Sequence, residues 1–176
     1  MDVRIDVSTR DVVLAVWDRV VLALFRGRTT VQALRRAGQL VPELHASSKE
    51  LVFMLTVVEE QASLPALEVR MELVSFLKGV NGQVDRSAVV FEGEGFRAAS
   101  VRAVVAGVSL FSRPDYPHRV FGSVGSAARF LSGGRQGVLV PHRVIRMVQE
   151  ARRAPGTQTF LPWMHGVPST ASLRPR

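Results

Sequence analysis

Apolar residues along the chain form short continuous runs that are typical of buried strands. The runs cover residues 12–17, 20–25, 51–58, 87–91 and 119–121. Only Asp18 and Arg19 separate the first two runs, which predicts an antiparallel pair of strands. The run at 51–58 is apolar apart from Thr56. A parallel strand that is covered on both faces has this pattern, so we place this run at the centre of a sheet.

The first interval between runs has apolar residues at helical spacing. Thr29 or Thr30 is positioned to cap a helix at its amino end. The predicted apolar positions of this helix are Val31, Leu34, Val41 and Leu44. We expect Pro42 to kink the helix or to end it early, because proline lacks an amide hydrogen and its ring crowds the preceding turn.

Three more helices are predicted farther along the chain. The second opens at Ser63 and Pro65, ends at Asn81 and Gly82, and buries a face made of Leu67, Met71, Val74 and Leu77. The third covers residues 96–111, and its apolar face consists of Val101, Val104, Val105, Val108 and Phe111. The fourth covers residues 123–131.

Strands and helices therefore alternate after an initial strand pair. Such an order requires right-handed crossovers and a largely parallel sheet. We predict an α/β fold with a mixed, mostly parallel five-stranded sheet and four helices.

Charge is distributed unevenly along the 176 residues. The chain carries a formal net charge of +8, and residues 134–176 hold seven arginines against one acidic residue, Glu150. Glycines 133, 134 and 137 mark the change in composition. We therefore predict an α/β domain over residues 1–133 and a basic, partly flexible extension over 134–176. The start of the chain has no signal-like apolar segment, and no run is long enough to span a bilayer, so we expect a cytoplasmic protein.

The predicted extension contains two features. Apolar residues from Val140 to Ala151 keep helical spacing with arginines around them, which predicts one basic amphipathic helix. The second feature is an apolar cluster formed by Phe160, Leu161, Trp163 and Met164. This cluster could anchor on the domain or dock a partner, and the arginines allow weak, non-specific contact with an anionic surface or a nucleic acid.

Four carboxylates follow the two most buried strands: Glu59, Glu60, Glu92 and Glu94. Because parallel strands end at the same edge of a sheet, we expect an acidic rim there. One interpretation is that these groups stabilise the amino ends of the following helices. The other is a surface that meets a basic partner or a divalent cation.

Catalytic chemistry is not indicated by the residue pattern. A cysteine nucleophile is excluded, and no serine lies in the sharp turn that a hydrolase needs. Asp115, Tyr116 and His118 form a polar cluster, but they precede a short strand, and we interpret them as a structural connection. We predict no enzymatic activity, no cofactor and no metal ion.

The hairpin start, the strand and glycine turn in SAVVFEGEGF (87–96) and the ending RVFGSVGSAARFL (119–131) resemble the STAS superfamily, of the anti-sigma-factor antagonist type. The sequence also resembles the STAS-like proteins that are grouped with CRAL-TRIO lipid-transfer domains and are common in bacteria as single-domain proteins of unknown role. The likeness covers residues 12–131.

The resemblance implies two kinds of function. STAS proteins are typically non-enzymatic regulators that bind a partner protein through the loop after the third strand, which here has the sequence EEQASLP (59–65). The acidic rim and this loop lie at the same predicted edge, so the predicted partner-binding residues are Glu59, Glu60, Ser63 and Glu94. The lipid-transfer side of the resemblance implies the alternative, a carrier or sensor of a small apolar or anionic, lipid-like ligand between the sheet and the helices.

Overall fold

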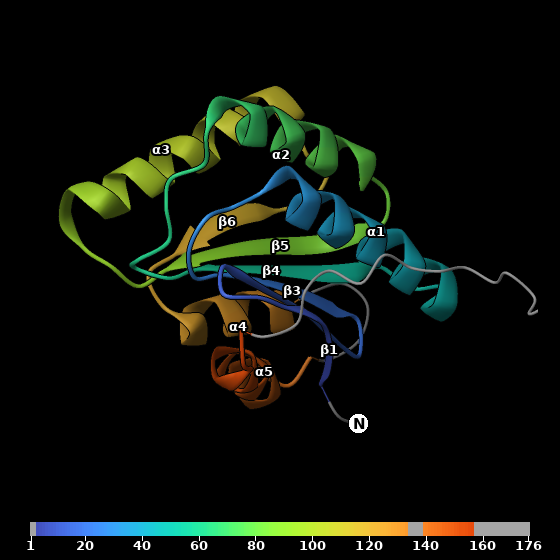
Figure 1. The fold of residues 1–176 in the computed structure, drawn as a ribbon. Helices are drawn as coiled ribbons and strands as arrows, with labels where there is room; N and C mark the ends of the chain where they lie inside the picture. The colour runs from blue at the N-terminus through green and yellow to red at the C-terminus, as the bar shows by residue number, and fades with distance from the viewer. Residues whose placement is uncertain (1–2, 134–138, 157–176) are drawn as a thin grey trace, which may run out of the picture.

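The structure is a computed structural model that describes residues 3–133 and 139–156 (Figure 1). Its strands are β1 (Arg4–Ser8), β2 (Val12–Trp17), β3 (Val20–Phe25), β4 (Val52–Val58), β5 (Val84–Phe91) and β6 (His118–Phe121). Its helices are α1 (Val31–Ser48), α2 (Leu67–Gly79), α3 (Gly95–Ser112), α4 (Val124–Ser132) and α5 (Pro141–Arg153). The predicted mixed α/β class is confirmed, but the described sheet has six strands, where the sequence analysis predicts five.

The strands lie in the sheet in chain order, from β1 to β6. β1, β2 and β3 are antiparallel, and β3 to β6 are parallel. Each crossover to the next parallel strand moves in the same direction, so right-handed connections place α1, α2 and α3 on one face. Figure 1 shows these three helices above the sheet, with α4 and α5 below it.

β1 is the strand that the sequence analysis missed. Ile5 and Val7 alternate with Arg4, Asp6 and Ser8, which is the ordinary pattern of a half-buried strand. A β-bulge between Ile5 and Val7 reverses the alternation within the strand. Val7 therefore packs on the α1 side of the sheet, whereas Ile5 packs on the α5 side.

α1 continues through Pro42 to Ser48, so the expectation that proline would end this helix early is wrong. The helix begins where predicted, because the Thr30 side chain accepts a hydrogen bond from the amide of Ala33 at 3.2 Å. Leu40 and Val41, directly before the proline, are fully buried against the sheet. Their burial offsets the roughly 3 kcal/mol that a proline costs inside a helix.

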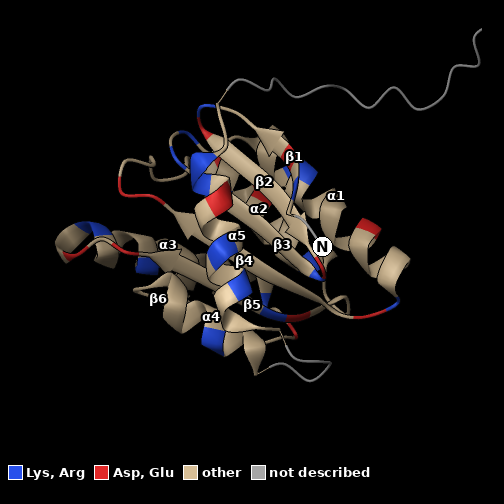
Figure 2. Cartoon of the chain, turned by 90° about the horizontal axis from the view of Figure 1, so that it is seen from below, with Lys and Arg blue, Asp and Glu red and all other residues tan. Residues whose placement is uncertain are grey.

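The second face of the sheet is covered by α4 and α5 (Figure 2). Val144, Met147, Val148 and Ala151 of α5 are at most 1% exposed and pack with β2, β3 and β4 residues. Arg26, which directly follows β3, also donates to the carbonyls of Ala151 and Ala154, each at 2.9 Å. The predicted helix is therefore present, but it belongs to the hydrophobic core, and the limit placed at residue 133 does not end the domain.

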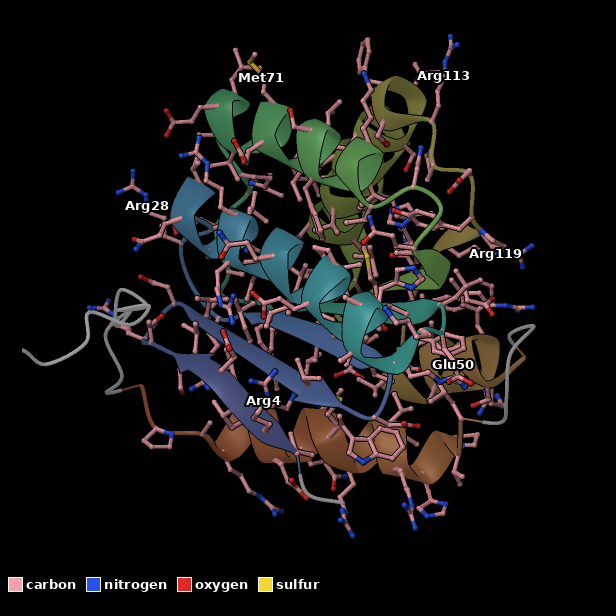
Figure 3. The ribbon with its side chains drawn as sticks, turned by 90° about the vertical axis from the view of Figure 1, so that its right-hand side faces the viewer. Arg4, Arg28, Glu50, Met71, Arg113 and Arg119 are labelled. Atoms are coloured by element: carbon pink, nitrogen blue, oxygen red, sulfur yellow. The ribbon has the colours of Figure 1, made fainter. Side chains whose placement is uncertain are left out.

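Some residues of α2 and α3 that were predicted to be buried are exposed. Leu67 and Met71, expected to be buried, are 73% and 64% exposed, and Figure 3 shows Met71 projecting away from the body of the protein. Phe111 of α3 is also exposed. The prediction is confirmed for Val74 and Leu77, which pack on the core together with Val69, Leu73 and Phe76. Both helices are apolar on more than one face, so their spacing alone does not identify the buried face.

Candidate functional site

A cavity of about 100 Å³ lies between the sheet and helices α2 and α3. The sheet contributes residues from β3, β4, β5 and β6, and the helices contribute a wall of aliphatic and aromatic side chains. The principal helix residues at the cavity are Leu73, Phe76, Leu77, Val101, Val104, Val105 and Val108. Its lining is largely apolar, as in most sites that small molecules occupy in proteins.

The cavity lies on one face of the sheet. β4 presents Met54 and Thr56 to it, β5 presents Ser87 and Val89, and α3 contributes valines. On the opposite face, the same strands present Phe53, Leu55 and Val90, which pack with residues of α4 and α5.

Two polar side chains lie together in this apolar lining. Ser87 of β5 is paired in register with His118 of β6, so both side chains lie on the same face of the sheet. Ser87 is 0% exposed, and neither its Oγ nor the Nδ1 of His118 has a hydrogen-bond partner among the described residues. Most buried polar atoms in proteins are hydrogen-bonded. Two buried polar atoms without a hydrogen-bond partner beside one cavity therefore indicate that a ligand could bind there.

The cavity is electrically neutral. Burial lowers the pKa of the His118 imidazole below its ordinary value of 6.5, which keeps the ring uncharged at neutral pH. No Asp, Glu, Lys or Arg side chain lines the cavity in the described part of the chain. Because Ser87 Oγ is not hydrogen-bonded to His118, the pair is not arranged as a nucleophile and its base.

The cavity extends from the interior to the edge where the parallel strands end. Ser87 and His118 lie toward the start of their strands, whereas Thr29, Ser63, Leu64 and Pro65 lie at the carboxyl edge. Leu64 is 43% exposed. Backbone groups hold this loop in place, since Ser63 N–H donates to the Gly27 carbonyl at 3.0 Å and Arg97 donates to the Ala62 carbonyl.

The predicted acidic rim is present but partly neutralised. Arg152 of α5 donates to Glu59 Oε1 and to Glu92 Oε2, each at 2.8 Å. Glu92 Oε1 also accepts from the amide of Val124, at the start of α4, at 3.2 Å. Burial opposes ionisation of Glu92, but the hydrogen bonds from Arg152 and Val124 outweigh it and lower the pKa of this carboxyl. Two of the four carboxylates therefore attach α5 to the carboxyl edge of the sheet.

The other predicted partner residues remain at the surface. Glu60, Ser63 and Glu94 are exposed, and Glu94 is the N-cap residue of α3. Ser63 also lines the cavity, which brings the predicted partner loop to the cavity edge. The apolar cluster Phe160, Leu161, Trp163 and Met164 lies outside the described residues.

The sequence analysis named neither Ser87 nor the pairing of His118 with it. The available signal was weak: Ser87 directly precedes the apolar run from Ala88 to Phe91, but it also follows the charged residues Asp85 and Arg86. His118 was assigned to a structural connection because it precedes a short strand. The strand pairing brings it beside Ser87, and pairing between strands about 30 residues apart is not visible in local spacing.

Two further observations concern metal ions and membranes. The described residues contain no group of three His, Cys, Asp or Glu side chains that could hold a metal ion. In residues 3–133 and 139–156, none of the helices has the length and apolar character needed to cross a bilayer.

The fold and the cavity together define an α/β domain with an internal apolar site. No protein-family model matches the sequence, and no curated protein does so either. A solved structure from Shewanella loihica PV-4, described as an uncharacterised protein of the DUF3478 family with a SpoIIAA-like fold, is 15% identical with a TM-score of 0.46. The match covers 74% of this chain and 92% of that chain.

Proposed function

We propose that this protein binds a small, largely apolar molecule in the cavity between the sheet and helices α2 and α3. The observation that carries the proposal is the cavity itself, apolar over most of its lining and provided with two unpartnered polar atoms at its inner end. This was the alternative implied by the sequence, a carrier or sensor of a small ligand.

The size of the cavity limits its occupant. Apolar cavities of about 150 Å³ inside proteins admit benzene or xenon. A cavity of about 100 Å³ that opens toward the carboxyl edge therefore suits a compact molecule of about the size of one aromatic ring, or the end of a longer chain that leaves past Leu64 at that edge.

Xenon is a suitable first probe because it tests for space without testing for polar recognition. We expect dissolved xenon to shift the methyl resonances of Val104, Val105 and Val108 in ¹³C NMR spectra. Val105→Met extends a side chain into the cavity and should remove those shifts. Ala106→Met, one position along α3 on its exposed side, is the matched control and should leave them unchanged. Absence of xenon-dependent shifts in the unmodified protein would refute the proposal.

A second candidate function is docking of a partner protein with a basic surface, and two exposed carboxylates favour it. Glu60 and Glu94 follow neighbouring strands at the same edge of the sheet, and neither takes part in the Arg152 ion pairs. The test is affinity purification with Glu60→Lys and with Glu94→Lys as separate variants, each compared with Glu68→Lys on α2 as the charge-matched control. A partner that all three variants retain equally would exclude docking at this edge.

A further inference from the structure

We propose that the ligand carries one uncharged hydroxyl group, which binds between Ser87 Oγ and His118 Nδ1 at the inner end of the cavity. This inference rests on the proposed function and goes on to define the chemical class of the ligand: a small apolar alcohol or phenol. Three observations lead to it.

The first observation is the position of the two polar atoms. Ser87 and His118 are direct neighbours on adjacent parallel strands, and strands in a sheet lie about 4.8 Å apart. Both side chains line the same cavity, and both atoms are buried without a partner among the described residues. One oxygen atom placed between them is within reach of both.

The second observation is the lack of charge around them. The described residues place no charged side chain in the cavity lining, and burial lowers the pKa of His118, so the imidazole is neutral. A carboxylate, phosphate or ammonium group would lose its hydration there without gaining a counter-ion. The lining therefore selects against ionised ligands.

The third observation concerns donors and acceptors. A serine hydroxyl both donates and accepts, whereas a neutral imidazole nitrogen does one or the other, depending on the tautomer. A ligand hydroxyl also does both, so it satisfies Ser87 and His118 for either tautomer. A carbonyl oxygen only accepts, and it would leave Nδ1 unpaired when that nitrogen carries no proton.

The test compares three probes of similar shape: benzene, phenol and benzoate, titrated into the full-length protein and followed by the NMR shifts of the cavity methyl groups. Phenol should bind about tenfold more tightly than benzene, which corresponds to about 1.4 kcal/mol. Benzoate should cause no saturable shift. Ser87→Ala and His118→Phe should each remove most of the preference for phenol while leaving the affinity for benzene within about threefold.

Ser112→Ala is the matched control. Ser112 is also a buried serine whose Oγ has no partner among the described residues, but it does not line the cavity, so its replacement should leave the phenol preference intact. Binding of benzene without a preference for phenol would overturn this inference and leave the proposed function standing. A preference for phenol that is retained in both Ser87→Ala and His118→Phe would also overturn the inference and leave the proposed function standing. Failure of xenon, benzene and phenol alike would overturn both.

Discussion

Replacement of Met147 by alanine tests whether α5 is part of the core. Met147 is 0% exposed and packs between α5 and the sheet with Val144, Val148 and the β-strand side chains. Truncation of a buried methionine to alanine removes its transfer free energy and leaves a cavity, and such changes cost about 2–5 kcal/mol. For a loss of about 3 kcal/mol and a urea m-value of about 2 kcal/mol/M, the unfolding midpoint falls by about 1.5 M.

The measurement is urea unfolding followed by circular dichroism, with Arg146→Ala as the control. Arg146 is the neighbouring residue, its side chain is 65% exposed, and its ion pair with Glu150 at 3.1 Å is worth about 0.3–0.5 kcal/mol in a helix. If Met147→Ala lowers the midpoint no more than Arg146→Ala does, α5 is not packed as the structure shows. The assignment of residues 139–154 to the domain core would then be wrong.

Three other changes test particular interactions. Arg152→Ala removes two partly exposed ion pairs and should cost about 0.5–1 kcal/mol at low salt and less at 1 M salt, with Arg153→Ala near neutral, as urea midpoints would show. Thr30→Ala removes the N-cap of α1 and should cost about 1 kcal/mol in the same assay. His118 has a lowered pKa in the folded protein, so the unfolded chain takes up its proton first as the pH falls. The free energy of unfolding should therefore decrease below pH 6.5, and His118→Phe should reduce that decrease in a pH series of thermal melts.

The ion pairs of Arg152 also affect how interaction experiments are interpreted. Substitution of Glu59 would disturb the attachment of α5 as well as the rim, so Glu60 and Glu94 are the cleaner probes of partner binding. Removal of the chain after Gly133 would uncover the apolar face formed by Leu22, Leu24 and Leu55. Loss of a partner after that truncation could therefore result from unfolding or from exposure of the core, and it would not by itself identify a binding site.

The sequence by itself determined the order of the elements from β2 to α5 and the centre of the sheet. Continuous apolar runs at residues 20–25 and 51–58 can be stable only when both faces are covered, so local composition was sufficient to predict buried strands. The cap at Thr30 is also a local interaction, because its donor lies three residues away. The α/β class and the predicted tail helix depend on short-range patterns of this kind.

Only the tertiary structure decided which faces meet and where space remains. Leu67, Met71 and Phe111 are apolar but exposed, because α2 and α3 carry apolar residues on more than one face and only one face of each helix packs on the core. The ion pairs of Arg152 join positions 93 and 60 residues apart. Ser87 and His118 become neighbours through strand pairing, and the cavity beside them results from the volumes of side chains on separate elements. These features depend on packing between distant segments, which local periodicity does not encode.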